Sequence, residues 1–178
     1  MKRFGPELLA QQVAEEMASS VLTIFDGASA KSGWTPIENL FFVALYLKQK
    51  TIEAETMRMG LLKASSHTKA QEVLKSRTDV EFGVFPQCQV GGWRVDFLIG
   101  VLSAGGMSWL VVECDGHDFH ERTKEQAAKD RSRDRECQSK GLTVFRFTGS
   151  ELFRNPLGCA TQVYDWLVKE YWRLEDGA

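Results

Sequence analysis

The chain has 178 residues, of which 43% are hydrophobic and 26% are charged, a composition typical of one globular domain with a substantial core. It contains no run of about 18 apolar residues that would cross a membrane, and Gln11, Gln12, Glu15 and Glu16 interrupt the apolar core that a signal peptide needs. The formal net charge of −2 gives no overall attraction to nucleic acid, so a nucleic-acid enzyme of this composition would need a local basic face.

The four cysteines, Cys88, Cys114, Cys137 and Cys159, are widely spaced along the chain. They form no Cys-x-x-Cys pair, which argues against a zinc site. The spacing also gives no sign of a secreted disulfide framework. We therefore expect free thiols in a reducing compartment, and a cytoplasmic protein.

Helical spacing of apolar residues predicts a first helix over residues 6–25, followed by a polar break. The next helix has a clear start signal, because Thr35 is a suitable N-cap, Pro36 suits the first helical position and Glu38 completes a capping box. We expect this helix to end near Lys50. We expect residues 1–34 to be an N-terminal helical extension and residues 35–178 to be a single globular unit.

The segment 51–78 is polar and basic, with a possible short helix at 65–77. Three strand-like runs follow at 80–90, 93–102 and 107–114, and double glycines between them favour an antiparallel meander. A polar helix from about 122 to 140, a strand at 142–147, a turn or short helix at 150–153 and an amphipathic helix at 157–174 complete the chain. This order predicts an α/β sandwich, a central mixed four-stranded sheet flanked by helices.

Two carboxylates end the third of these strands, in the stretch "WLVVECDGHDFH" at 109–120. Because side chains alternate along a strand, Glu113 and Asp115 point to the same side. Like charges this close repel each other unless a cation or a base lies between them, and oxygen ligands suit Mg²⁺ or Mn²⁺. The alternative is that Asp115 and Gly116 form an ordinary turn and that Glu113 faces solvent.

A third acid lies in the preceding strand, where Asp96 stands between Val95 and Phe97. An isolated ionised carboxylate among apolar residues is costly unless it is paired or binds a metal. If the strands 93–102 and 107–114 form a hairpin, Asp96 lies close to Glu113. The alternative is that Asp96 pairs with Arg94.

The order of elements over residues 35–147 resembles the PD-(D/E)XK, or restriction-endonuclease-like, nuclease superfamily. The acids of that family's motif match Asp96, Glu113 and Glu38. The stretch "VVECDGHDFH…KDRSRDRECQSKGLTVFRFTGSEL" resembles a branch related to very-short-patch repair endonucleases and uncharacterised endonuclease-like domains. The resemblance spans residues 35–153. One position departs from it, because Asp115 replaces the lysine that usually follows the glutamate by two residues; Lys129 or Lys124 is a candidate replacement.

The resemblance implies a metal-dependent nuclease acting on DNA. Asp96 and Glu113 would hold Mg²⁺ or Mn²⁺, with the backbone carbonyl of Cys114 as a further ligand. Glu38 would position a water or a second cation, although helix capping alone also explains this residue.

Other residues would handle protons and phosphates. Asp115, Lys129 or His120 would orient the attacking water or take its proton. Lys129, Arg133 and Arg122 would contact phosphates. Two alternatives stay open: a nuclease fold that binds DNA without cutting it, and a protein-interaction domain. A homodimer is compatible with this class of enzyme, but no interface can be read from the sequence.

Overall fold

The computed structural model describes residues 33–51, 57–115 and 124–178. Its centre is a five-stranded mixed sheet with the strand order β1-β2-β5-β6-β7. These strands are β1 (Met59–Leu61), β2 (Phe82–Pro86), β5 (Phe97–Ser103), β6 (Gly106–Asp115) and β7 (Thr143–Thr148). The short strands β3 (Gln89–Val90) and β4 (Trp93–Arg94) form a separate two-stranded hairpin.

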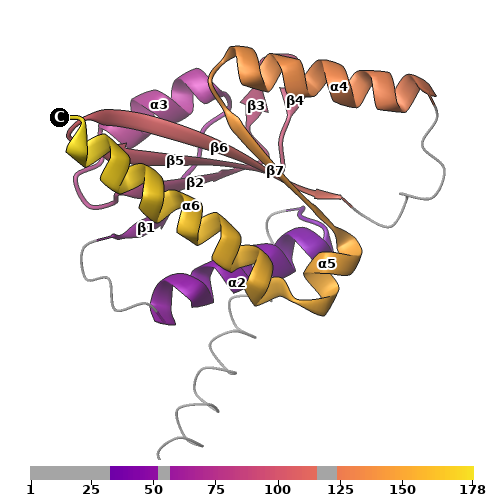
Figure 1. Cartoon of the computed structure of the whole chain (residues 1–178), viewed down its shortest axis with the longest axis horizontal. Coiled ribbons are helices and arrows are strands. Elements are labelled where there is room, and N and C mark those ends of the chain that lie inside the picture. Colours follow the sequence, from indigo (N-terminus) through magenta and orange to yellow (C-terminus); the bar gives the residue numbers. More distant parts are fainter. Residues whose placement is uncertain (1–32, 52–56, 116–123) are drawn as a thin grey trace, which may run out of the picture.

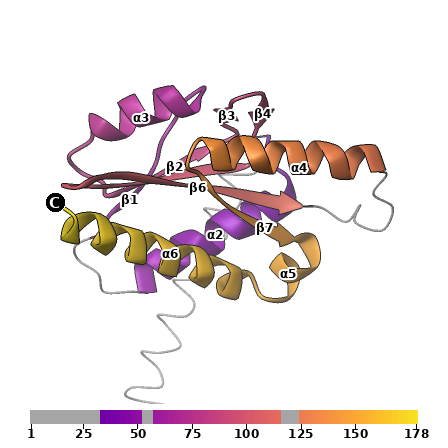
Figure 2. The same ribbon diagram turned by 45° about the horizontal axis from the view of Figure 1, so that its top comes forward.

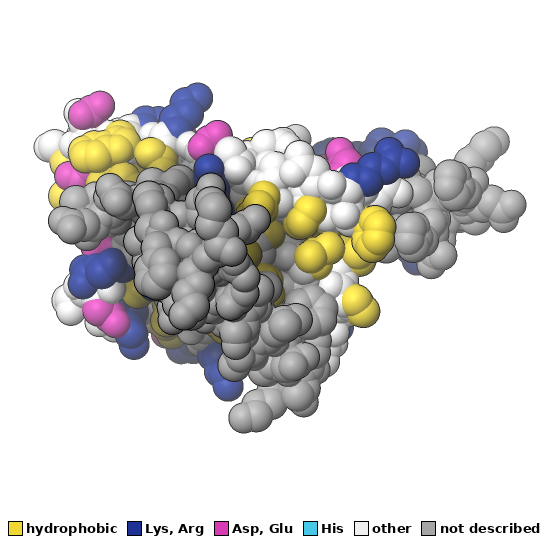
Figure 3. Space-filling model, turned by 90° about the horizontal axis from the view of Figure 1, so that it is seen from below, with side chains coloured by type: hydrophobic (Ala, Val, Ile, Leu, Met, Phe, Trp, Pro, Cys, Tyr) yellow, Lys and Arg dark blue, Asp and Glu magenta, His cyan; other side chains and the backbone are white. Residues whose placement is uncertain are grey.

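Helices cover both faces of the sheet (Figures 1 and 2). On one face lie α3 (His67–Lys75) and α4 (Lys124–Ser139), and on the other lie α2 (Pro36–Thr51), α5 (Gly149–Arg154) and α6 (Pro156–Asp176). Seen from below, the molecule presents hydrophobic side chains interspersed with charged ones (Figure 3). This arrangement confirms the predicted α/β sandwich. No helix in the described part of the chain is long and apolar enough to cross a membrane.

The alternation of side chains along β6 divides the core into two layers. Leu110, Val112 and Cys114 belong to the cluster that also contains buried residues of α2 and α6. Trp109 and Val111 belong to the opposite cluster, beneath α3 and α4. Glu113 continues the second set, so its side chain points to the α4 side of the sheet.

The strand pairing brings the predicted acids together. The β5 and β6 strands form the predicted antiparallel hairpin, with Phe97 opposite Val112. The ladder ends there; Asp96 directly precedes β5, and its carboxyl accepts a hydrogen bond from the backbone N–H of Cys114, the residue after Glu113. The β6 and β7 strands are parallel, and α4 makes the crossover between them.

The sheet has one strand more than the four predicted. The additional strand, β1, has only three residues and pairs in parallel with β2, with Met59 opposite Phe82. Such a short strand carries no readable alternation, and its partner lies more than 20 residues away along the chain. The possible helix at 65–77 is confirmed as α3, and its N-cap Ser66 accepts a hydrogen bond from the backbone of Lys69 at 3.3 Å. The predicted helix at 6–25 lies outside the described residues.

Two predicted strands are interrupted in the structure. The run 80–90 leaves the sheet after Pro86 because Gln87 has a φ of +53°. The run 93–102 is broken between β4 and β5, at Val95 and Asp96. Both interruptions lie at the end of the sheet that carries the acids.

The β3–β4 hairpin packs against α4 and fixes that helix over the sheet. The backbone N–H of Gly92 donates to Glu136 on α4 at 3.3 Å. Gly91 has a φ of +57°, and a Cβ at this position would lie 1.7 Å from a carboxylate oxygen of Glu136. Glycine suits both requirements, since it has no Cβ and accepts a positive φ without strain.

Candidate active site

The centre of the site is the acid pair of Asp96 and Glu113 at the end of the β5–β6 hairpin. Glu113 is buried, with 4% of its surface exposed. Asp96 Oδ2 accepts a hydrogen bond of 2.7 Å from the backbone N–H of Cys114, the residue after Glu113. This bond fixes the Asp96 carboxyl against β6, next to the backbone that follows Glu113.

Arg133 on α4 forms an ion pair with Glu113. Its Nη2 contacts Glu113 Oε1 and also donates to the backbone carbonyl of Arg94 at 3.1 Å. The side chains of Arg133 and Glu113 are 19% and 6% exposed. The cation that reaches the acid pair therefore comes from the helix that crosses over it.

Burial raises the pKa values of both acids, and the charge of the nearby Asp115 adds to each rise. Burial raises the pKa of Glu113 to about 8, with Arg133 acting in the opposite direction and the charges of Asp96 and Asp115 adding to the rise. The pKa of Asp96 is also raised, mainly by burial, while its hydrogen bond from Cys114 and the charge of Arg133 oppose the change. An added cation would relieve this repulsion and favour both ionised forms.

Glu38 caps α2 and also lies close enough to Asp96 for the charge of Asp96 to affect it. The predicted capping box is confirmed, because Thr35 N–H donates to Glu38 Oε2 at 3.2 Å and Glu38 N–H donates to Thr35 Oγ1 at 3.3 Å. Glu38 also belongs to the acid cluster: its pKa is raised first by burial and then by the charge of Asp96. The start of α2 therefore faces the acid end of the sheet.

Gln87 forms hydrogen bonds with both Glu38 and Asp96, a connection that was not predicted from the sequence. Its Nε2 donates to Glu38 Oε2 at 3.1 Å, and its backbone N–H donates to the carbonyl of Asp96 at 2.8 Å. A residue other than glycine with a positive φ is under strain, and such residues are concentrated at functional sites. The only sequence signal was a polar residue directly after a proline.

The remaining predicted residues are placed as follows. Asp115 ends β6 and contributes its charge to the cluster. Burial raises the pKa of the Cys114 thiol, which lies in the core on the opposite face, so only the backbone of this residue is available to the site. Lys129 is exposed on α4. His120 and Arg122 lie outside the described residues.

The acid pair fits a hard divalent cation that keeps part of its water shell. Mg²⁺ is usually bound by one or two carboxylates together with several waters. In the ranges that the structure describes, no group of three or more His, Cys, Asp or Glu side chains is close enough to hold a metal ion. Two carboxylates of raised pKa, completed by water, are the donor set available here.

The family REase_MTES_1575, which is restriction-endonuclease-like, matches residues 70–167. This chain belongs to that family. The matched segment contains Asp96, Glu113 and Arg133 and leaves Glu38 outside. Membership supports the PD-(D/E)XK superfamily predicted from the sequence, whereas the branch near very-short-patch repair endonucleases stays a prediction.

The other comparisons add little. No curated protein matches the chain. Among solved structures, the chain is similar to HopZ1a in complex with IP6, at 12% sequence identity and a TM-score of 0.39. The similarity covers 91% of this chain and 56% of HopZ1a. A likeness this distant carries no argument about fold or function.

Proposed function

We propose that this protein is a metal-dependent nuclease that hydrolyses phosphodiester bonds in DNA. One observation carries the proposal: Asp96 and Glu113 lie at the same end of the β5–β6 hairpin, with the Asp96 carboxyl bound to the backbone N–H of Cys114, in a chain of a restriction-endonuclease-like family. Burying two acids side by side is unfavourable for a stable fold. Arg133 supplies one positive charge at Glu113, and a divalent cation would neutralise the remaining charge of the two acids.

Asp96 and Glu113 would hold Mg²⁺ or Mn²⁺, with the backbone carbonyl of Cys114 as an additional ligand. When bound, the cation would lower the pKa of a water molecule and neutralise charge on the phosphate. Glu38, which Gln87 holds at 3.1 Å, would position a water on the Asp96 side.

Arg133 takes over part of the role of the missing lysine. The usual lysine position is occupied by Asp115, and Arg133 instead brings a positive charge to Glu113 from α4. An arginine stays protonated in proteins, so Arg133 would stabilise charge on the phosphate but would not accept a proton. Proton transfer would then depend on Asp115, His120 or Lys129.

A second candidate function is DNA binding without cleavage. Two observations favour it: the Glu-x-Lys lysine is replaced by Asp115, and the Glu113 carboxylate is already paired with Arg133. A protein of this kind would bind DNA with an affinity that falls as salt rises, and would leave the strand intact.

Cleavage of supercoiled plasmid and of single-stranded DNA, with Mg²⁺, Mn²⁺ or EDTA, separates these functions. Asp96→Asn and Glu113→Gln keep the shape of each side chain, and Glu72→Gln changes an exposed acid on α3 as a matched control. We expect metal-dependent nicking by the wild type and by Glu72→Gln, and only the background of the EDTA reaction in the other two. DNA binding without nicking would select the second function.

A further inference from the structure

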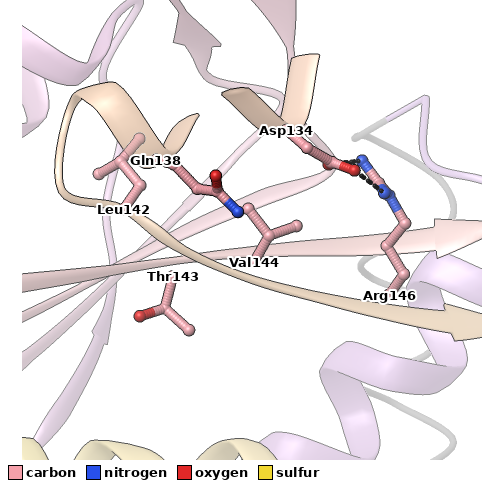
Figure 4. A pocket seen from close by; sticks show the side chains of 6 residues that line it. All are labelled: Asp134, Gln138, Leu142, Thr143, Val144 and Arg146. Atoms are coloured by element: carbon pink, nitrogen blue, oxygen red, sulfur yellow. Dashed lines mark hydrogen bonds and ion pairs between the residues drawn. The ribbon is translucent and has the colours of Figure 1, made fainter. Parts of the chain in front are cut away.

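A pocket lies between α4 and β7 (Figure 4). Its lining combines polar and apolar side chains: Asp134, Gln138, Leu142, Thr143, Val144 and Arg146. β7 is the last strand of the sheet on this side. The pocket is thus open to a ligand that runs along the sheet edge.

The polar feature of this pocket is an arginine held by an aspartate. Arg146 Nη1 donates to Asp134 Oδ2 at 3.1 Å, and Arg146 Nη2 donates to Asp134 Oδ1 at 2.5 Å (Figure 4). A guanidinium has five N–H donors in a fixed plane, so this fork leaves further donors for a second partner. The side chains of Arg146 and Asp134 are 27% and 36% exposed, which keeps them accessible from the pocket.

Arg146 is also the direct neighbour of the acid pair. In the parallel β6–β7 ladder, Arg146 is the partner of Glu113, and adjacent strands are about 4.8 Å apart. The charges of Arg146 and Glu113 interact. The hydrogen bonds to Asp134 raise the pKa of Arg146 most, and the charge of Glu113 adds to the rise. A nucleic-acid strand placed over the acid pair would therefore carry a neighbouring phosphate past Arg146.

The ion pair of Arg146 and Asp134 contributes little to the stability of the fold. A partly exposed ion pair contributes about 0.2–1 kcal/mol to folding. An arginine whose planar fork is oriented in advance, however, loses less entropy when it binds a phosphate, and arginine matches phosphate geometry well.

We propose that the pocket between α4 and β7 binds a DNA phosphate. This phosphate is the neighbour, on the same strand, of the phosphate that is hydrolysed. Arg146 is the phosphate ligand, and Asp134 is the positioning residue that orients it. Gln138, on the same wall of the pocket, is a further donor toward that phosphate. This inference rests on the proposed function, because it takes DNA as the ligand.

The test is the affinity for a fluorescent duplex oligonucleotide in EDTA, measured over a range of KCl concentrations. Arg146→Gln should weaken binding about tenfold and reduce the slope of log K against log salt by about one, as expected for one lost phosphate contact. Arg146→Lys should keep the slope and bind with intermediate affinity. Asp134→Asn should also keep the slope, with affinity reduced a few-fold.

Arg77→Gln is the matched control, because Arg77 also donates two hydrogen bonds to one aspartate, from Nε and Nη2 to Asp79 at 2.7 and 2.5 Å, on the surface after α3. Thermal unfolding shows whether each variant is folded, and Arg146→Lys keeps the test decisive if Arg146→Gln is not. Equal affinity and slope for wild type, Arg146→Gln and Arg77→Gln would overturn the inference while leaving the nuclease proposal intact. A wild type that binds no DNA in EDTA would overturn the inference, and one that also cuts no DNA with Mg²⁺ or Mn²⁺ would overturn both.

Discussion

Arg133 and Glu113 form a nearly buried ion pair at the point where the family's motif would place a metal. The positive charge of Arg133 lies on the same carboxylate that a divalent cation would use. Metal-free protein therefore has its own cation at this acid, and a bound metal would share Glu113 with Arg133 or displace it.

Arg133→Gln should destabilise the protein, and more strongly at high pH. Breaking a buried ion pair from one side costs about 3–5 kcal/mol when the remaining charge stays ionised. Since the pKa of Glu113 is about 8 with Arg133 in place, this carboxyl is already largely protonated at pH 6, so the substitution breaks an ion pair at pH 9 but only a hydrogen bond at pH 6. Urea unfolding at pH 6 and pH 9 measures the difference, with the exposed α4 residue in Arg131→Gln as the control. A cost that is the same at both pH values, or absent, would contradict the described pairing.

The stability of the metal-free protein should fall as the pH rises from about 4.5 to about 8. The pKa of Glu113 is raised from 4.5 to about 8 on folding, so the native state binds more protons than the unfolded state across this interval. The stabilisation is complete below the lower value and is lost as the pH passes the upper one. Glu113→Gln should flatten the dependence of the unfolding midpoint on pH in EDTA, and Glu72→Gln should not. An unchanged slope in Glu113→Gln would show that another group titrates.

Gln87 allows backbone strain to be separated from side-chain function. Gln87→Gly and Gln87→Ala both remove the hydrogen bond to Glu38, but only glycine relieves the positive φ. We expect Gln87→Gly to be more stable than Gln87→Ala by about 1 kcal/mol, as the cost of a left-handed conformation implies. Both variants should cut DNA more slowly than the wild type. Chemical denaturation of the two variants side by side is the check, and equal stabilities would rule out the strain.

The helix-capping contact of Glu38 and its proposed role in cleavage can also be separated. Thr35→Ala removes the N-cap hydroxyl and should cost about 1 kcal/mol of folding stability while leaving cleavage unchanged. Glu38→Ala should lower both stability and cleavage, because it also removes the acid beside Asp96. Unfolding and nicking assays on the same preparations test this, and a Glu38→Ala variant with full activity would restrict Glu38 to helix capping.

The sequence was sufficient to predict the features that depend on local pattern. The capping box of Thr35 and Glu38 follows from residue types at fixed spacing. The location of Asp96 and Glu113 at one end of the sheet follows from the hairpin, because its two strands are close in sequence. The double glycines between the strand-like runs were enough to predict that hairpin.

The features that depend on packing between distant segments could not be predicted. α4 carries several cations, and the sequence does not show which of them reaches Glu113. The pairing with Arg133 depends on the position of α4 over the sheet, where the β3–β4 hairpin contacts the helix through Glu136. The contact between Gln87 and Glu38 spans 49 residues and joins a turn to a helix start. Pairing of β1 with β2 likewise depends on a long-range contact with no periodic signal.

The most direct test of the account is the binding of Mn²⁺ to the purified protein, measured by titration calorimetry at pH 8. Asp96→Asn and Glu113→Gln each remove one of the two proposed ligands, and Glu72→Gln again serves as the control. We predict that the wild type and Glu72→Gln bind Mn²⁺ and that the other two variants, still folded, lose this binding. Binding of equal strength in all four proteins, or none in the wild type, would contradict the proposal that this acid pair is a metal site.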